Sequence, residues 1–262
     1  MGIQIKNLQA AYEDTVIIPC ADLTIPEGKI TMLIGPNGCG KSTLLKSAAR
    51  ILPVKKGEVL LDGKNMKKMT QKSIARKMAV LPQSPLVPDG ILVKDLVGYG
   101  RFPYQRPMSG FGKEDHEIIN WAMKKTDVYD LRNQRAGELS GGQRQRVWIA
   151  LALAQKTEIL LLDEPTTYLD MAHQLEILTL LKKLNTEEHT TIIMVIHELN
   201  LACKFADHMI GMKNGEIIFE GAPEDVIHEN NLRKLYEIEA VLVKNQEKGY
   251  PICMDYSLLH EK

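Results

Sequence analysis

Residues 35–43 contain the residue types that bind phosphate: Gly35, Pro36, Asn37, Gly38, Cys39, Gly40, Lys41, Ser42 and Thr43. The apolar stretch 29–34 before this run predicts a buried strand, and the pattern after it is helical. Glycines let consecutive backbone N–H groups face an anion, and a helix that starts here adds the positive end of its dipole. Lys41 supplies a mobile charge for the β- and γ-phosphates, and the Ser42 hydroxyl can bind Mg²⁺. The run therefore predicts a loop that binds a nucleoside triphosphate.

A second predicted helix start also leaves backbone N–H groups uncovered: Leu139, Ser140, Gly141, Gly142 and Gln143. Ser140 and Gln143 have the spacing of a capping box, and residues 147–154 form an apolar helical run. Two glycines weaken a first helical turn by about 1 kcal/mol each, so an ordinary helix cap does not explain them. A second anion-binding helix start is explained if it contacts a nucleotide held by another copy of the chain.

Two adjacent carboxylates, Asp163 and Glu164, close the continuous apolar run 159–162. Such runs are typical of central parallel strands that are buried on both faces. We expect Asp163 to hold Mg²⁺, directly or through water, beside Ser42. Glu164, one residue further, can orient or deprotonate a water molecule. Because adjacent carboxylates in apolar surroundings are costly unless a metal or proton compensates them, this pair predicts a catalytic centre.

Three further side chains are candidates because of their places at predicted strands. Gln83 follows the strand 78–82 and His197 follows the strand 191–196, and polar residues beyond strand ends in α/β sheets face the ligand crevice. The alternatives are a loop glutamine that caps backbone groups and an ordinary polar histidine. Tyr12 is either a face on which a base stacks or a half-exposed strand tyrosine, and its spacing does not decide between them.

Composition limits the partners and the compartment. The chain has 262 residues, 33 Lys and Arg against 33 Asp and Glu, and a pI of about 7.1, which argues against nucleic-acid binding. The four cysteines lack zinc or CxxC spacing, as expected for a reducing cytoplasm without disulfides or structural metal. We find no signal peptide and no apolar run of the ~18 residues that span a bilayer. Any membrane role is therefore expected to depend on a partner.

The elements that position these residues follow from the pattern along the chain. Alternation in 3–25 predicts antiparallel strands, and the basic stretch 64–77 predicts a helix. Residues 84–144, rich in Pro and Gly at first and then helical, predict a small helical insertion. Asn214-Gly215 predicts a hairpin, followed by a helical tail over 224–235. Beyond Tyr236 the sequence shows strand-like alternation and no chemistry.

Taken together, in their order and context, these motifs resemble the ATP-binding subunits of ABC transporters over about residues 3–224. Segments 98–104 and 163–170 are similar to the ATPases of iron–siderophore, haem and cobalamin importers. The resemblance implies an α/β P-loop NTPase fold (RecA-like): a mixed sheet core with an N-terminal antiparallel β subdomain and an inserted helical subdomain. It implies an ABC ATPase domain over 1–236, with 237–262 as a C-terminal extension of that domain. Cys39 departs from the Ser or Ala that the family often has.

The resemblance also implies a role for each candidate residue. Ser140, Gly141 and Gly142, within the signature 139–143, would bind the γ-phosphate of ATP held by the other subunit. The remaining roles implied are adenine stacking by Tyr12, contact of Gln83 with Mg²⁺ or the attacking water, γ-phosphate contact by His197, and a dimer-interface position for Asp170.

The resemblance further implies partners and a location. Two copies would close head-to-tail on ATP and Mg²⁺, at the cytoplasmic face of the cell membrane, against integral membrane permease subunits. A substrate-binding protein would act indirectly, and no nucleic acid is expected. ATP hydrolysis would power import of an iron–siderophore or related metal chelate. The alternative is a non-transport ABC ATPase of translation or iron–sulfur assembly.

Overall fold

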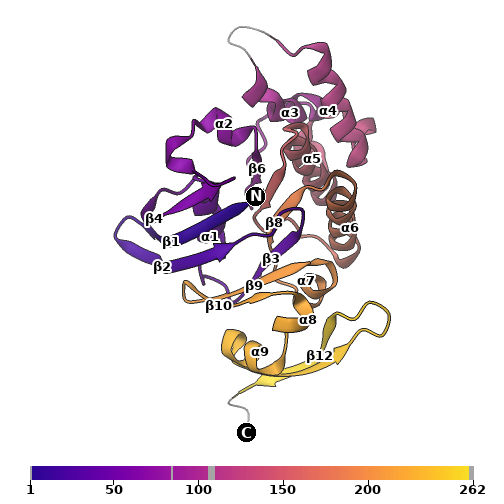
Figure 1. Cartoon of the computed structure of the whole chain (residues 1–262). Coiled ribbons are helices and arrows are strands. Elements are labelled where there is room, and N and C mark those ends of the chain that lie inside the picture. The colour runs from indigo at the N-terminus through magenta and orange to yellow at the C-terminus, as the bar shows by residue number, and fades with distance from the viewer. Residues whose placement is uncertain (1, 84, 106–109, 260–262) are drawn as a thin grey trace. The chain divides into compact units, whose positions relative to one another are not determined.

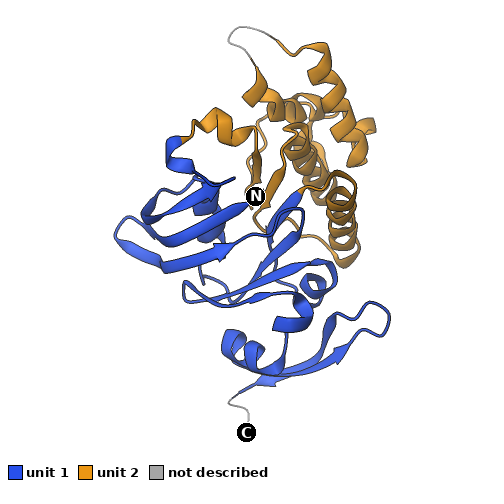
Figure 2. Cartoon of the chain, viewed as in Figure 1, with its two compact units in different colours: residues 1–68, 191–262 blue, residues 69–190 orange. Residues whose placement is uncertain are grey.

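The computed structural model describes residues 2–83, 85–105 and 110–259, in two compact units that Figure 2 distinguishes by colour. Unit 1 comprises Met1–Lys68 and Thr191–Lys262, and unit 2 comprises Met69–Thr190. Residue 84, where the predicted helical insertion begins, lies outside the described residues, as do 106–109 within it. Residues 1 and 260–262, at the ends of the predicted domains, lie outside them too.

Unit 1 begins with four antiparallel strands in the order β2-β1-β4-β5 (Figure 1). These strands are β1 (Ile3–Tyr12), β2 (Thr15–Thr24), β4 (Val54–Leu61) and β5 (Lys64–Asn65). In β1 the side chains of Ile3, Ile5 and Leu8 are buried, whereas Lys6 is exposed. This burial of one face confirms the predicted N-terminal antiparallel strands.

The second sheet of unit 1 carries the strand that leads into the phosphate loop. Its strands are β10 (Glu216–Gly221), β9 (His208–Lys213), β3 (Ile30–Ile34) and β8 (Thr191–Val195), in that order. Strand β3 is parallel to both β8 and β9, and every residue of β3 and β8 is buried. Helices α1 (Lys41–Ala48) and α7 (Leu199–Phe205) follow β3 and β8. Continuous apolar strands are therefore central here, as their sequences predict.

The hairpin predicted at Asn214-Gly215 is confirmed. It joins β9 to β10 through two residues of positive φ, 52° at Asn214 and 81° at Gly215, as a type I′ turn requires. These two residues tolerate the left-handed conformation better than most.

The helical tail predicted over 224–235 is wrong in one respect, because it is two helices. Helix α8 (Pro223–Val226) ends where Ile227 becomes extended and buried, and α9 (Glu229–Tyr236) starts afterwards. The Asn231 side chain donates to the Val226 carbonyl at 2.8 Å and so caps the first helix. The chain then forms a hairpin of β11 (Ile238–Lys244) and β12 (Pro251–Leu258).

Unit 2 combines two parallel strands with a group of helices (Figure 1). Strands β6 (Met78–Leu81) and β7 (Ile159–Leu162) pair directly. The α-helices are α2 (Gln71–Ala75), α3 (Val93–Gly98), α4 (Lys113–Lys125), α5 (Gly141–Ala154) and α6 (Met171–Glu188). Three-ten turns are η2 (Tyr99–Tyr104), η3 (Tyr129–Leu131) and η4 (Ala136–Glu138).

Residues 98–104 contact both α4 and α5 and hold the two helices together. A Cβ on Gly100 would lie 2.3 Å from the Leu151 carbonyl oxygen, so η2 approaches α5 too closely for a side chain there. Arg101, 4% exposed, donates to Asp115 of α4 at 2.8 Å and to the Ala154 carbonyl of α5 at 3.0 Å. One buried guanidinium thus holds both helices.

The prediction that 64–77 is helical is wrong for its first part. Lys64 pairs with Leu61 in the β4–β5 ladder, and η1 (Met66–Lys68) follows. Helix α2 begins only at Gln71, where the Thr70 hydroxyl accepts from the Ser73 N–H at 3.1 Å. Among the described residues, no helix has both the length and the apolar composition needed to cross a bilayer.

Candidate functional site

The loop 35–43 is closed by its own lysine. Lys41 Nζ, in a side chain that is 5% exposed, donates to the carbonyl oxygens of Gly35 at 2.8 Å and Pro36 at 2.9 Å. Gly40 precedes α1 with a φ of 105°. Gly35 has a φ of 144°, and a Cβ there would lie 2.0 Å from the Met212 carbonyl oxygen. Both positions therefore require glycine, as a tight phosphate loop does.

Two hairpins of unit 1 contact this loop. The Gly215 N–H in the β9–β10 turn donates to the Cys39 carbonyl at 2.9 Å. The Ile17 side chain of β2 lies 3.4 Å from where a Cβ of Gly40 would be. Tyr12, at the end of β1 next to β2, is 45% exposed. An exposed ring at this end of the β1–β2 hairpin is able to stack on a base.

His197 lies at the same edge of the sheet as the loop. Strands β3 and β8 are parallel, with Leu33 opposite Val195, and the Ile196 N–H donates to the Leu33 carbonyl at 3.2 Å. His197 comes next and is exposed, whereas Ile196 is buried. The carboxyl ends of β3 and β8 thus deliver Gly35 and His197 to one edge.

Tyr236, at the end of α9, is a residue that the sequence did not single out. The Gly35 N–H donates to its hydroxyl. Burial raises the pKa of Tyr236 well above its ordinary value, and the Gly35 N–H offsets only part of that effect. Lys213 Nζ donates to Glu237 Oε1 at 2.7 Å and to the Lys234 carbonyl at 2.9 Å. The end of α9 is therefore bonded both to the phosphate loop and to β9.

In unit 2, Gln83 and Glu164 contact each other at the ends of two neighbouring strands. Leu81 pairs with Leu162, and the Asp163 N–H donates to the Leu81 carbonyl at 2.9 Å. Gln83 Nε2 donates to Glu164 Oε2. The predicted convergence of polar residues at this edge is thus observed for the side chains of Gln83 and Glu164.

Glu164 is held in an uncommon conformation. Its φ is 53°, in the left-handed region that non-glycine residues seldom adopt. The Thr167 hydroxyl donates to Glu164 Oε2 at 2.9 Å, the oxygen that also accepts from Gln83. Such strained backbone persists where surrounding contacts fix it, and it clusters at functional sites. The sequence analysis did not single out Thr167. The feature that could have pointed to it is its position three residues after Glu164.

The residues predicted to hold Mg²⁺ suit that ion. Ser42, Gln83 and Asp163 offer a hydroxyl, an amide oxygen and a carboxylate, which are the oxygen donors that Mg²⁺ prefers. Asp163 is 2% exposed, so its carboxylate is costly to bury without a compensating cation. Among the described residues, no group of three or more His, Cys, Asp and Glu side chains is placed to hold a metal.

The capping box predicted at the start of α5 is confirmed. Ser140 Oγ accepts from the Gln143 N–H at 3.3 Å, and Gln143 Oε1 accepts from the Ser140 N–H at 3.1 Å. Ser140, Gly141 and Gln143 are exposed, whereas Gly142 and Leu139 are buried. Leu139 thus anchors the start of the helix, while Ser140, Gly141 and Gln143 remain open at the surface.

Asp170 caps the next helix. Its Oδ1 accepts from the His173 N–H at 2.9 Å and lies 2.8 Å from His173 Nδ1. These two bonds lower the pKa of Asp170. The neighbouring side chains of Tyr168 and Met171 are 91% and 76% exposed. The cap of α6 therefore lies in an open part of the surface of unit 2.

The predicted site residues fall into two groups. Unit 1 contains 35–43, Tyr12 and His197, and unit 2 contains Gln83, Asp163, Glu164, 139–143 and Asp170. Within unit 2, Gln83, Asp163 and Glu164 lie together at the ends of β6 and β7. Residues 139–143 and Asp170 lie instead at the starts of α5 and α6.

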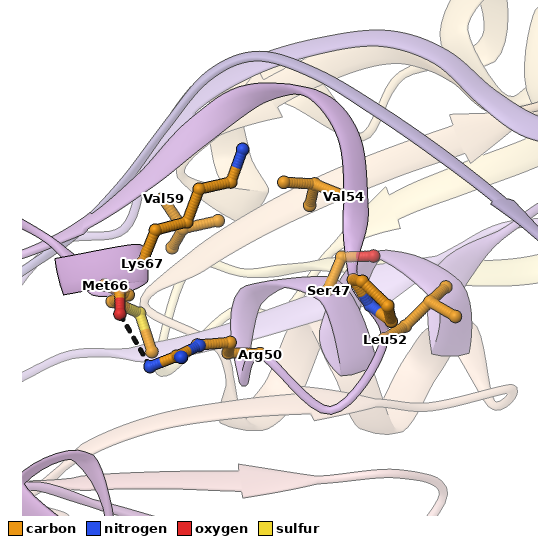
Figure 3. Close-up of a pocket in the computed structure, with 8 residues that line it drawn as sticks. Ser47, Arg50, Leu52, Val54, Val59, Met66 and Lys67 are labelled. Atoms are coloured by element: carbon orange, nitrogen blue, oxygen red, sulfur yellow. Dashed lines mark hydrogen bonds between the residues drawn. The ribbon is translucent and has the colours of Figure 1, made fainter. Parts of the chain in front are cut away.

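A pocket in unit 1 lies beyond the end of α1 (Figure 3). Its walls come from the last turn of α1, from β4 and from η1, and Arg50 Nη1 donates to the Met66 carbonyl at 2.8 Å. Apolar side chains such as Val59 and Leu52 line much of it, and none of the predicted nucleotide residues does. The pocket is therefore separate from the phosphate loop.

Comparison with known proteins places this arrangement in a family. The ABC transporter family model matches residues 20–167. The iron(3+)-hydroxamate import ATP-binding protein FhuC of Bacillus subtilis (strain 168) is 50% identical over 261 residues, which cover 98% of this chain and 96% of that protein. The chain therefore belongs to the ABC transporter family, among its ATPases.

Two solved structures are similar over most of the chain. One, described as an inward-facing conformation of a metal-chelate type ABC transporter, has a TM-score of 0.83 at 25% identity and covers 98% of this chain and 96% of its own. The other is a dimeric post-hydrolysis state of the ATP-binding cassette MJ0796 bound to ADP and Pi. It has a TM-score of 0.73 at 28% identity, covering 84% and 98%. The predicted α/β P-loop NTPase fold and the prediction of an ATPase are confirmed.

Proposed function

We propose that this chain powers a membrane importer of iron(III)–siderophore complexes or related metal chelates by hydrolysing ATP. The hydrolytic part is supported chiefly by one observation: Glu164 follows the buried Asp163 and accepts hydrogen bonds from Gln83 and Thr167. The cargo is supported by the likeness to FhuC, whose name states iron(3+)-hydroxamate import, and to a metal-chelate type transporter.

ATP binding is assigned to the groups at one edge of unit 1. The N–H groups of 35–43 and the dipole of α1 would hold the phosphates, with Lys41 exchanging its carbonyl partners for phosphate oxygens. Tyr12 would stack on adenine, and His197 would contact the γ-phosphate. The carbonyl bonds of Lys41 support this role, because they keep a cation inside the loop.

Hydrolysis is assigned to the strand ends of unit 2. Glu164 would orient the attacking water and take its proton, and Gln83 would keep that carboxylate aimed while contacting the water or the metal. Ser42, Gln83 and Asp163 would hold Mg²⁺, which when bound neutralises charge on the phosphates.

The exposed start of α5 is assigned to contact with a second copy of the chain. Ser140, Gly141 and Gly142 would bind the γ-phosphate that the partner copy holds, and Asp170 would lie at the interface. Support comes from the exposed residues Ser140 and Gly141 at the start of the capped helix and from the exposed Tyr168 and Met171 beside Asp170. ATP would then join two copies, and its hydrolysis would release them.

The transport partners are integral membrane permease subunits, with a substrate-binding protein acting through them. This chain would sit peripherally at the cytoplasmic face of the membrane. Its helical segments would transmit closure of the two copies to the permease.

The test is complementation of a Bacillus subtilis strain that lacks FhuC. Expression of this chain should restore uptake of radiolabelled ferric hydroxamate, while the Lys41→Ala variant, made at equal abundance, should not. Detergent extracts should yield the chain together with integral membrane proteins. Recovery of ribosomes or iron–sulfur scaffold proteins instead, with no uptake, would favour the non-transport ATPase and overturn the proposal.

A further inference from the structure

The two glycines that open α5 lie in different surroundings. A Cβ built on Gly141 would meet no atom within 4 Å, whereas a Cβ on Gly142 would lie 2.7 Å from His173 Cδ2. Both glycines have helical backbone. The backbone conformation therefore does not require glycine at 142, but the imidazole of His173 occupies the space of a side chain there.

The opposite edge of the same imidazole is bonded to Asp170. His173 Nδ1 lies 2.8 Å from Asp170 Oδ1, and the His173 N–H donates to that oxygen at 2.9 Å. The ring is thus held between a carboxylate at the start of α6 and the backbone of Gly142 at the start of α5.

The contact between α5 and α6 continues one turn further. Arg146, four residues after Gly142, donates to Glu176, three residues after His173. Residues at these spacings share one helix face, so the same two faces meet at both points. Of the two contact points, the one between His173 and Gly142 lies nearer to the starts of both helices.

We propose that His173 is a positioning residue that ties the exposed start of α5 to Asp170. The inference rests on the proposed function, which assigns Ser140–Gly142 to the partner's nucleotide and Asp170 to the interface between copies. Because one ring contacts both segments, a displacement of either one is passed to the other. The two segments then meet the partner copy in a fixed relation.

The first experiment is a double-mutant cycle on thermal stability, which needs no partner. Gly142→Ala should lower the melting temperature by about 3 °C or more, because the new methyl group clashes with the His173 ring. Gly141→Ala is the matched control and should leave it unchanged or raise it, because alanine favours the helix. Gly142→Ala combined with His173→Ala should recover the loss. An equal loss with and without His173 would overturn the contact.

The second experiment measures MgATP-dependent dimerisation by sedimentation in a Glu164→Gln background. His173→Ala should raise the dimer Kd about tenfold, equivalent to about 1.4 kcal/mol. His173→Asn keeps a donor for Asp170 but loses the ring over Gly142, and His173→Phe keeps a ring but loses the donor. The dimer Kd of each of these two variants should lie between that of the Glu164→Gln chain and that of the chain with His173→Ala. Binding of a fluorescent ATP analogue to the single copy should not change.

The outcomes separate this inference from the proposed function. If the Glu164→Gln chain itself fails to dimerise, the proposed function is wrong, and the stability cycle still tests the His173 contact. If that chain dimerises and His173→Ala leaves its Kd unchanged, the positioning role is wrong although the proposed function stands.

Discussion

Gln83 donates a hydrogen bond from Nε2 to Glu164 Oε2 across 81 residues of sequence. The bond joins the second residue after β6 to the second residue after β7, and it uses the amide nitrogen of Gln83. The amide oxygen on the other side of that group is a suitable ligand for a metal or water. The Gln83 side chain can therefore orient the Glu164 carboxylate and at the same time bind a metal or water.

Replacing Glu164 by Gln should remove hydrolysis while leaving ATP binding intact. The amide keeps the shape of the side chain but has no carboxylate to take a proton, so kcat should fall by ~10² or more. Phosphate release and equilibrium ATP binding measure the two properties, and the variant should accumulate the closed dimer. Undiminished turnover would remove Glu164 from this role.

Replacing Gln83 by Ala should lower kcat more than it alters the KM for ATP. Without the amide, Glu164 keeps its bond to Thr167 but loses its second fixed donor, so we expect a fall of about tenfold. Gln83→Glu should be worse, because it sets a second carboxylate against Glu164. Steady-state kinetics of both variants give the answer, and equal rates for the two would contradict the hydrogen-bonding explanation.

Replacing Tyr236 by Phe should raise the KM for ATP about fivefold at similar kcat. The hydroxyl accepts from the Gly35 N–H, and a lost hydrogen bond of about 1 kcal/mol loosens the first turn of the loop. Tyr256→Phe, at a residue that is 69% exposed in the same C-terminal region, is the control and should leave KM unchanged. Equal effects of the two variants would show that the Gly35 contact is unimportant.

The Arg101–Asp115 pair predicts a pH-dependent stability. Burial raises the pKa of Asp115, but hydrogen bonds from Arg101 and the Gly112 N–H outweigh burial, so the pKa lies below its ordinary value of 3.8. The stability is therefore present above that ordinary value and is lost as the pH falls through the lower folded value. Asp115→Asn should cost about 2 kcal/mol at pH 7, and the difference should shrink below about pH 4.

Urea unfolding across this pH range measures that difference. Glu117→Gln is the control. Glu117 is exposed, and its Oε1 lies 4.0 Å from Lys113 Nζ. Such surface pairs contribute little, so this variant should be nearly neutral at every pH. A constant Asp115→Asn effect from pH 7 to pH 3 would contradict the assignment.

Local chemistry explains what the sequence predicted well. The Ser140–Gln143 capping box and the Asn214-Gly215 turn depend on residues at most three apart, so their patterns determine their geometry. Continuous apolar runs likewise predicted β3, β7 and β8, because strands buried on both faces need no polar side chains.

Contacts between distant residues were beyond this reasoning. Two glycines predicted an exposed helix start, yet Gly142 is buried beneath His173, 31 positions later, and only Gly141 is open. Tyr236 showed no pattern that linked it to Gly35. Spacing along a chain carries no information about which side chain fills the space above a particular glycine.

The break between α8 and α9 shows a similar limit. The helical pattern continues through 227–228, and the chain leaves the helix because Ile227 is buried and Asn231 caps the Val226 carbonyl. Tertiary burial overrides a continuous local preference there.

The final hairpin has one more consequence, through Asn200. Its side chain donates to the Cys253 carbonyl at 3.0 Å and accepts from the Cys253 N–H at 2.8 Å, so β12 is bonded to the start of α7, three residues after His197. Truncating the chain after residue 244 would remove no residue that is assigned to ATP. It would nevertheless release the segment that carries His197, so a shortened protein should handle nucleotide differently from the full-length one.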